Sequence, residues 1–293
     1  MAKARALDRR RKSIRGIRKI TRTMELISTA QFKRAMDRAI AAAAYTRRIS
    51  AVVGHLVRAG REIAHPLLQP RPETKRATLL MLTANRGLCA GYNSSMIRLT
   101  TARYRELCAA VPEVQLEVAG KRGISAFRFR KISIAESFTH FNDKPSFAEI
   151  DVLAVRYLAD FLAGRIDRLD VAYTKFENAS HQSAVVETLL PLGDLGEEGD
   201  GGLFAGEPQY DFLPSAESII DEVAPASFKA KLFKCFLDAA VSEQIARMVA
   251  MKAATENADG MVSQLSMAYN RARQGQITGE LLEIIGGAEA LNE

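Results

Sequence analysis

Apolar residues recur at helical spacing at both ends of the chain. Near the N-terminus the intervals are three or four residues, which place the side chains on one face of a helix. The members of this stripe are Ile14, Ile17, Ile20, Met24 and Ile27. Toward the C-terminus the pattern continues with Ile245, Met248, Met261, Leu265 and Ala268. The pattern predicts two very long helices, over residues 1–58 and roughly 226–285.

Helices of this length need a partner. A helix of about 60 residues is about 90 Å long and is stabilised mainly by the packing of its apolar face. Nothing else in the sequence could cover two such stripes. The two helices are therefore predicted to cover each other as an antiparallel coiled coil, with the remainder of the chain forming a globular body inserted between them.

The central part of the chain alternates short apolar runs with helical segments. Strands are predicted at 77–82, 114–118, near 131–135, at 170–175 and at 183–190, and helices at about 92–110, 121–128 and 147–163. This alternation favours helices on both faces of a mostly parallel sheet, with the last strand at an antiparallel edge. The predicted fold class is thus α+α/β, a long antiparallel coiled coil with an inserted three-layer, Rossmann-like α/β domain. The predicted parts are an N-terminal helix over 1–65, the inserted domain over 66–208 and a C-terminal helix over 209–293.

Prolines and glycines suggest where the long helices end. The first should end before His65-Pro66, because the residue before proline disfavours the helical conformation. Pro225 is expected to interrupt the C-terminal helical region, with Ser227 capping the long helix that follows and Gly286-Gly287 ending it. Residues 193–206 are rich in glycine and acidic residues, which predicts a flexible loop.

Composition limits the class of protein. At 293 residues and 47% hydrophobic content the chain can bury one or two cores, but no apolar run is long enough to span a membrane. The basic N-terminus lacks the apolar segment of a signal peptide. It would also fit an organellar transit peptide, but the unbroken apolar stripe favours a helix of the mature protein. Cys89, Cys108 and Cys235 are widely spaced, which indicates thiols in a reducing compartment, and the four scattered histidines predict no metal site.

The net charge of +7 is unevenly distributed. Residues 1–48 contain 15 basic and 3 acidic side chains, whereas residues 176–228 contain 11 acidic side chains and no Lys or Arg. The N-terminal helix should therefore attract acidic partners.

One segment superficially resembles a catalytic turn. Cys89 lies between Gly87 and Gly91 directly after a predicted strand, as a nucleophile would. No histidine is near it in sequence, so a structural turn is favoured over a stand-alone α/β enzyme. Phosphate-binding glycine patterns do not follow any predicted strand. We therefore expect no catalytic residue, no cofactor and no metal in this chain.

Two polar stretches of the long helices are candidates for binding. The basic segment from Arg9 to Arg22 could be a solvated face, a nucleic-acid surface or a surface for an acidic protein partner. It lacks aromatic residues for base stacking, so a protein partner is favoured. In residues 269–278 the apolar stripe thins and polar side chains crowd the helix. Contacts of this kind suit a shaft that turns inside a surrounding sleeve, since polar contacts of moderate strength can be broken and remade.

Four segments, in order and at the right spacing, resemble the gamma subunit of F-type ATP synthase over nearly the full chain. They are residues 17–27 (IRKITRTMELI), 85–93 (NRGLCAGYN), 242–258 (SEQIARMVAMKAATENA) and 269–288 (YNRARQGQITGELLEIIGGA). The resemblance implies a central rotor that couples ion-driven rotation of a membrane ring to ATP synthesis. It implies alpha and beta subunits, an epsilon subunit and the c-ring as partners, and a peripheral position on the cytoplasmic face of a bacterial inner membrane.

The resemblance also implies roles for particular residues. Arg273 and Gln274 should bond the catch loops of the beta subunit. Arg9, Arg10 and Arg22 should face its acidic lever segment, and Met24 should lie at the bearing. ATP should contact other subunits, and nucleic acid is not an expected partner.

Three departures from the family pattern modify these expectations. Ala90 replaces a usual glycine, so its φ is predicted not to be positive. Leu213 stands where the family often has an acidic residue near the ring and epsilon, which weakens a polar contact there. Residues 193–206 contain no cysteine, so the thiol switch of chloroplast relatives, and redox regulation with it, is not expected.

Overall fold

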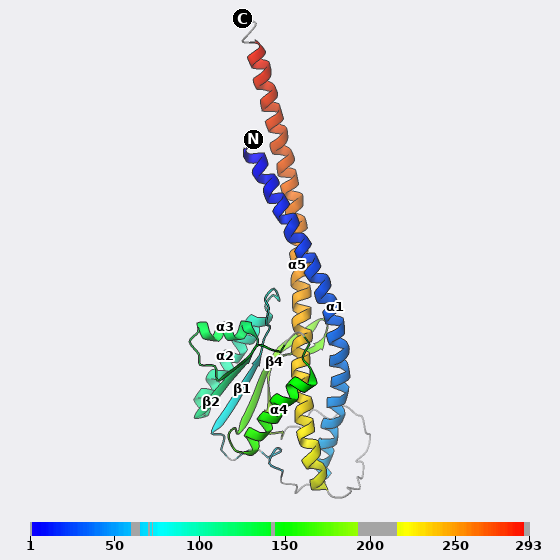
Figure 1. Cartoon of the computed structure of the whole chain (residues 1–293), viewed down its shortest axis with the longest axis vertical. Helices are drawn as coiled ribbons and strands as arrows, with labels where there is room; N and C mark the ends of the chain where they lie inside the picture. Colours follow the sequence, from blue (N-terminus) through cyan, green and yellow to red (C-terminus); the bar gives the residue numbers. More distant parts are fainter. Residues whose placement is uncertain are drawn as a thin grey trace. The chain divides into compact units, whose positions relative to one another are not determined.

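The computed structural model describes residues 2–59, 65–69, 71, 73–141, 144–192 and 216–289 (Figure 1). Its elements in chain order are α1 (Ala2–Ala59), β1 (Arg76–Leu82), α2 (Tyr92–Ala110), β2 (Glu113–Ala119), α3 (Lys121–Phe129), β3 (Glu136–Phe138), α4 (Phe147–Leu162), β4 (Arg168–Asn178), β5 (His181–Leu190) and α5 (Ala216–Glu289). They form two compact units. The helical unit combines Met1–Thr29 with Arg247–Glu293, and the body is Ala30–Ala246.

The body contains a mixed five-stranded sheet in the order β3-β2-β1-β4-β5. β1 pairs in parallel with β2 and β4, and β2 pairs in parallel with β3. β5 pairs with β4 in the antiparallel sense and forms one edge. The prediction of a mostly parallel sheet with an antiparallel edge strand is confirmed.

The central strand β1 carries side chains to two cores. Because successive side chains of a strand point to opposite faces, Leu79 and Met81 pack under α2 and α3, whereas Leu80 and Leu82 pack under α4 and α5. Figure 1 shows these helices on the two faces of the sheet. A strand buried on both faces explains why its sequence is an almost continuous apolar run.

Within the body, α1 also lies along α5. Ala35 and Ala39 of α1 pack against Leu237, Val241 and Ile245 of α5 in a third apolar cluster. The small alanine side chains allow the backbones of α1 and α5 to approach closely. Further along α1, the Thr46 hydroxyl donates a hydrogen bond to the Ala42 carbonyl of the same helix at 2.9 Å.

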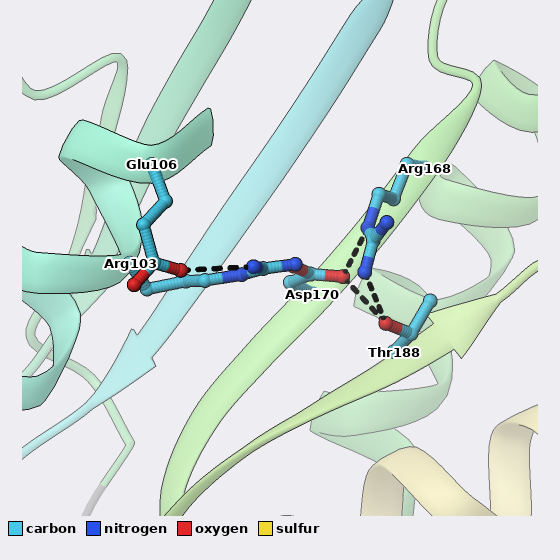
Figure 2. Close-up of polar contacts among 5 residues, drawn as sticks. All are labelled: Arg103, Glu106, Arg168, Asp170 and Thr188. Carbon is cyan, nitrogen blue, oxygen red and sulfur yellow. Dashed lines mark hydrogen bonds and ion pairs between the residues drawn. The ribbon is translucent and has the colours of Figure 1, made fainter. Parts of the chain in front are cut away.

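A buried carboxylate ties α2 to the antiparallel edge of the sheet (Figure 2). Asp170 on β4 is fully buried, and Arg103 of α2 donates to its Oδ2 from Nε at 3.0 Å and from Nη2 at 2.8 Å. Its Oδ1 accepts from Arg168 Nε at 2.7 Å and from the Thr188 hydroxyl of β5 at 2.9 Å. Glu106 accepts from the same Arg103 at 3.1 Å. Every charge in this group therefore has an opposite partner, as buried ions require.

A second buried acid lies where α5 covers the sheet. Asp238 is 2% exposed, and burial raises its pKa from the ordinary 3.8 to about 6, although Lys234 on the same helix, 3.5 Å away, lowers it. From the sheet, Glu187 of β5 raises this pKa and Lys175 of β4 lowers it. Asp238 therefore changes its charge near pH 6 inside the packing between α5 and the sheet.

The course of α5 contradicts the predicted breaks. Pro225 lies inside one continuous helix, Ser227 is buried in that helix instead of capping it, and the helix continues through Gly286-Gly287 to Glu289. The buried residues Ile220, Ala224 and Phe228 recur every four residues across the proline, so core packing offsets the lost backbone hydrogen bond. A glycine permits a left-handed end to a helix but does not require one.

Two local predictions in the body were also wrong. The strand expected near 131–135 begins later, at Glu136, because the register with Glu117 on β2 sets its position, and Lys131 instead closes α3 with a φ of 57°. Ala90 has a φ of 45°, contrary to expectation. Contacts of its neighbours hold this turn, since the Asn93 side-chain amide donates to the Cys89 sulfur at 2.9 Å. The expectations for 193–206 and Leu213 lie outside the described residues.

Replacing Asp170 with asparagine should destabilise the body. The change leaves Arg103 and Arg168 facing a neutral amide, and breaking a buried ion pair in this way costs about 3 kcal/mol. Urea unfolding of the full chain measures the loss. Glu106→Gln is the control, because its side chain is 64% exposed and should change the free energy of unfolding by less than about 0.5 kcal/mol. Equal effects of the two changes would contradict this account.

The free energy of unfolding should depend on the protonation of Asp238. The pKa in the folded body is above the ordinary value, so folding favours the protonated acid. Stability should therefore fall as the pH rises from about 4 to about 6 and should level off above that, by up to about 3 kcal/mol in total. Asp238→Asn should remove this fall and be the more stable form at pH 7. The exposed Asp37→Asn is the control, and an unchanged pH profile in Asp238→Asn would disprove the assignment.

Candidate functional site

Two helices of the helical unit run antiparallel and touch through polar side chains. The hydroxyls of Thr21 on α1 and Thr255 on α5 are 2.9 Å apart and buried. Arg18 Nε lies 2.5 Å from the Asp259 carboxylate. The residue number falls on α1 as it rises on α5, which establishes the antiparallel direction.

The side chains between the two helices recur at alternating intervals of three and four residues. On α1 the buried or half-buried positions include Ala4, Leu7, Arg11, Ile14, Thr21, Glu25 and Ser28. On α5 they include Met251, Thr255, Ala258, Val262, Leu265, Tyr269, Ala272, Gln276 and Gly279. Many of these residues are small or polar. Small side chains permit close approach of two helices but provide little apolar area to bury.

This inward face is not the predicted apolar stripe. Ile17, Ile20 and Ile27 are exposed, with Ile20 at 59%, whereas Ile14 and Met24 are half-buried. On α5, Met261 and Ala268 are exposed and Leu265 is half-buried. The prediction that the stripe is covered by the opposite helix was therefore wrong for Ile17, Ile20 and Ile27. The inward positions repeat every 3.5 residues, and the isoleucines fall one position to the side of that repeat.

The outer surface of the helical unit is consequently apolar and basic. Its large exposed apolar side chains are Ile17, Ile20, Leu26, Ile27, Val249, Met261, Met267, Ile277, Leu281, Leu282, Ile284 and Ile285. Exposed apolar residues in this number are typical of a surface that contacts another protein. The basic residues of α1 lie among them, so a partner needs both apolar and acidic groups.

The residues predicted to bind partners are mostly accessible. Arg9, Arg10, Arg273 and Gln274 are exposed. Arg9 and Arg10 belong to α1, and Arg273 and Gln274 belong to α5. Arg22 and Met24 lie further along α1.

Arg22 lines a polar groove between the two helices, and Met24 is not among the lining residues. Arg22 is 57% exposed and binds Glu25 at 2.7 Å, whereas Met24 is only half-buried. The groove is lined by Arg18, Lys19, Arg22, Thr23, Glu25, Lys252, Thr255, Glu256 and Asp259. Both signs of charge are present, so the groove is suited to polar contacts with a partner more than to an anionic ligand.

The candidate thiol has the contacts of a structural turn. Cys89 is 2% exposed and packs with Ala84 and Tyr92. The Tyr92 hydroxyl donates to the Ala239 carbonyl of α5 at 3.1 Å, which fixes the turn against the helix. These contacts support the structural interpretation of this segment.

The described residues also bear on metals and membranes. Among them, no three His, Cys, Asp or Glu side chains are grouped so that they could hold a metal ion. In the same part of the chain, no helix combines the length and apolar character needed to cross a membrane.

Comparison with known proteins gives matches along the whole chain. The family model for ATP synthase matches residues 3–291. The ATP synthase gamma chain of Rhodopirellula baltica is 57% identical over 294 residues, covering 99% of each chain, and that of Leptospira biflexa is 37% identical over 100% of each. Among solved structures, a chain of the Euglena gracilis mitochondrial ATP synthase matches with a TM-score of 0.64 at 18% identity, covering 99% of this chain and 95% of that one. A chain from the central stalk and c-ring of the Tetrahymena thermophila enzyme matches with a TM-score of 0.59 at 20% identity, covering 80% of this chain and 99% of that one.

These findings, with the paired helices and the α/β body, define the class as a central-stalk subunit of a rotary ATP synthase. The chain belongs to the ATP synthase gamma-chain family. The resemblance drawn from the four sequence motifs is thereby confirmed, as is the role of gamma subunit in the central stalk of F1.

Sequence reasoning missed the inward face of the helices. A signal was present, because positions 4, 11, 18 and 25 and positions 7, 14, 21 and 28 each repeat every seven residues. These positions hold Arg11, Thr21 and Ser28, and a search for apolar residues alone passes over them. The guanidinium of Arg11 also lies over the ring of Tyr269 on α5, and this contact was missed for the same reason.

The buried face of α1 carries Ser28 and the exposed face carries Ile27. A substitution at Ser28 should therefore lower the free energy of unfolding more than one at Ile27, whereas the apolar stripe would predict the reverse. Ser28 is 1% exposed, so Ser28→Leu should overpack the helix interface and cost about 2 kcal/mol. Ile27 is 52% exposed, so Ile27→Ser should change the free energy of unfolding by less than about 0.5 kcal/mol. Denaturant unfolding followed by circular dichroism measures both. If Ile27→Ser lowered the free energy of unfolding more than Ser28→Leu did, the apolar stripe would be the buried face after all.

Proposed function

We propose that this chain is the rotor that couples ion-driven rotation of the c-ring to conformational change in the alpha/beta hexamer, and so to ATP synthesis. The observation that carries the proposal is the number of large apolar side chains on the outside of the helical unit. Apolar residues such as Ile14 and Leu265 lie between the helices together with the polar Thr21, Ser28 and Thr255, whereas Ile17, Ile20, Leu26, Ile27, Met261 and Met267 lie outside. A helix pair that served only its own stability would bury the apolar residues and expose the polar ones.

The pairing itself is proposed to be a coiled coil. The inward residues of both helices repeat every 3.5 positions, which is the spacing of a left-handed supercoil. On this basis we propose the same division of the chain, with an N-terminal part over 1–65 that contains α1, an inserted domain over 66–208 and a C-terminal part over 209–293 that contains α5.

The outer surface differs from one side to another, and this asymmetry is the proposed basis of coupling. A surface with different side chains at different angles binds each conformation of beta with a different free energy. Turning it shifts the populations of those conformations. Arg9, Arg10 and Arg22 are proposed to attract the acidic lever segment of beta, and half-buried Met24 to lie at the bearing.

Arg273 and Gln274 are proposed to bond the catch loops of beta. Both are exposed in the helical unit, and each carries donors suited to carbonyl or carboxylate oxygens. Such contacts are strong enough to distinguish two conformations of the partner and weak enough to be remade as the shaft turns.

The chemistry of ATP is proposed to occur on other subunits, so that this chain contributes no catalytic residue, cofactor or metal. The body is proposed to contact the c-ring and the epsilon subunit. The whole assembly would hold the chain at the cytoplasmic face of a bacterial inner membrane and transport protons or sodium ions. Family membership supports each of these statements.

ATP hydrolysis by purified alpha and beta subunits, with and without this chain, tests the proposal. Assembly and faster turnover are expected with the wild-type chain. The double variant Arg273→Ala, Gln274→Ala should assemble and turn over about tenfold more slowly, because two polar contacts with beta are lost. Arg271→Ala is the control for loss of an exposed arginine, since Arg271 is also exposed but lies on the side of α5 opposite to Arg273.

One result would contradict the proposal as a whole, and another would contradict only the roles given to Arg273 and Gln274. If the chain failed to assemble with alpha and beta but bound DNA with a steep salt dependence, the basic helix would be a nucleic-acid surface instead. If the chain assembled and the double variant turned over at the wild-type rate, the rotor role would stand and the assignment of Arg273 and Gln274 would fail.

A further inference from the structure

Arg11 is a charged residue at an inward position of α1. Its guanidinium carbon lies 4.7 Å from the centre of the Tyr269 ring on α5. This is the distance of a cation–π contact, in which the positive charge is attracted to the negative face of the ring. The Arg11 side chain is only 19% exposed, and Tyr269 is half-buried.

A neighbouring acid holds Arg11 in this orientation. Asp8, one turn earlier on α1, accepts from Arg11 Nη2 at 2.6 Å and contacts Lys12 at 3.0 Å. The hydrogen bonds from Lys12 and Arg11 lower the pKa of Asp8, so the carboxylate stays charged at neutral pH. The guanidinium therefore has one charged partner on its own helix and an aromatic partner on the opposite helix.

This contact differs from the other polar links between the two helices. The Arg18–Asp259 pair is about half exposed, at 52% and 49%, and ion pairs in water contribute little. The Thr21–Thr255 bond joins two neutral hydroxyls. Arg11 and Tyr269 lie nearer to the start of α1 than either pair, and their larger burial makes the attraction stronger.

The position of Tyr269 connects this contact to function. Arg273 follows Tyr269 by four residues, so the two lie one above the other on α5, and Gln274 comes next. At this level, α5 is still flanked by α1. The contact between Arg11 and Tyr269 therefore lies about one turn of α5 away from Arg273 and Gln274.

We propose that Arg11 and Tyr269, with Asp8, form a clamp that positions Arg273 and Gln274 for contact with the beta subunit. Arg11 acts as a positioning residue: it stiffens the turn of α5 next to these two side chains by keeping the first turns of α1 docked on it. The inference rests on the proposed function in its last step only, because the clamp itself is a feature of this chain.

Amide hydrogen exchange of the full-length chain tests the clamp. Exchange over residues 5–14 should be about threefold faster in Arg11→Gln and in Tyr269→Leu, since either change removes the cation–π contact. Tyr269→Phe retains a ring and should behave as wild type. The exposed Arg15→Gln is the matched control for loss of a positive charge. Combining Arg11→Gln with Tyr269→Leu should add little to either change alone, because both remove one contact.

ATP hydrolysis by the assembly with alpha and beta tests the positioning. Arg11→Gln should lower turnover about threefold when Arg273 and Gln274 are present, in line with a contact of about 0.7 kcal/mol. It should have no further effect in the Arg273→Ala, Gln274→Ala background. A merely structural role would lower turnover by the same factor in both backgrounds.

The outcomes separate the clamp from the proposed function. Wild-type exchange in Arg11→Gln, or equal acceleration in Tyr269→Phe and Tyr269→Leu, would overturn the clamp whatever the assembly does. Faster exchange with equal turnover effects in both backgrounds would overturn the positioning role. If the wild-type chain did not stimulate hydrolysis at all, the proposed function would fail, while the exchange results would still decide whether the clamp exists.

Discussion

Close pairing of α1 with α5 is the constraint on which the helical unit depends. The residues between the helices combine small side chains, such as Thr21, Ser28 and Ala258, with larger ones, such as Ile14 and Leu265. The small residues bury little apolar area, so specific links between the helices add to the stability. The hydroxyl pair Thr21–Thr255 and the stacked Arg11–Tyr269 pair provide them. Pairing through small and polar residues also leaves the larger apolar side chains of α1 free for contact with other subunits.

The body follows a different rule, because large apolar side chains fill both faces of its sheet. The buried acids Glu117, Asp167 and Asp170 each pair with arginine, and Asp170 with Arg103 and Arg168 is the fullest case. Asp238 also has a partner, Lys234, but its burial outweighs this attraction and raises its pKa to about 6. The same helix α5 thus contributes apolar residues and a titratable acid to the body, and polar residues to the helical unit.

Much of the body could be predicted from the sequence, because its elements are short and strongly patterned. The apolar run of β1 and the Ser146–Glu149 capping box that begins α4 are local signals, and both elements lie where they were expected. Pro225 and Ala90 were misjudged because tertiary contacts overrode a local rule: core packing around Phe228 carries α5 through the proline, and the contacts of Cys89 hold Ala90 at a positive φ. The outward isoleucines were misjudged because hydrophobicity identifies residues that avoid water without saying which partner will cover them.

The outward apolar face has a consequence for the life of the chain before assembly. Ile20, Ile27 and Leu281 are each more than half exposed, and water would favour any contact that hides them. Until its partners arrive, the newly made chain is therefore prone to self-association. Synthesis in step with the other subunits would keep the concentration of the free chain low. A low concentration protects the chain from aggregation.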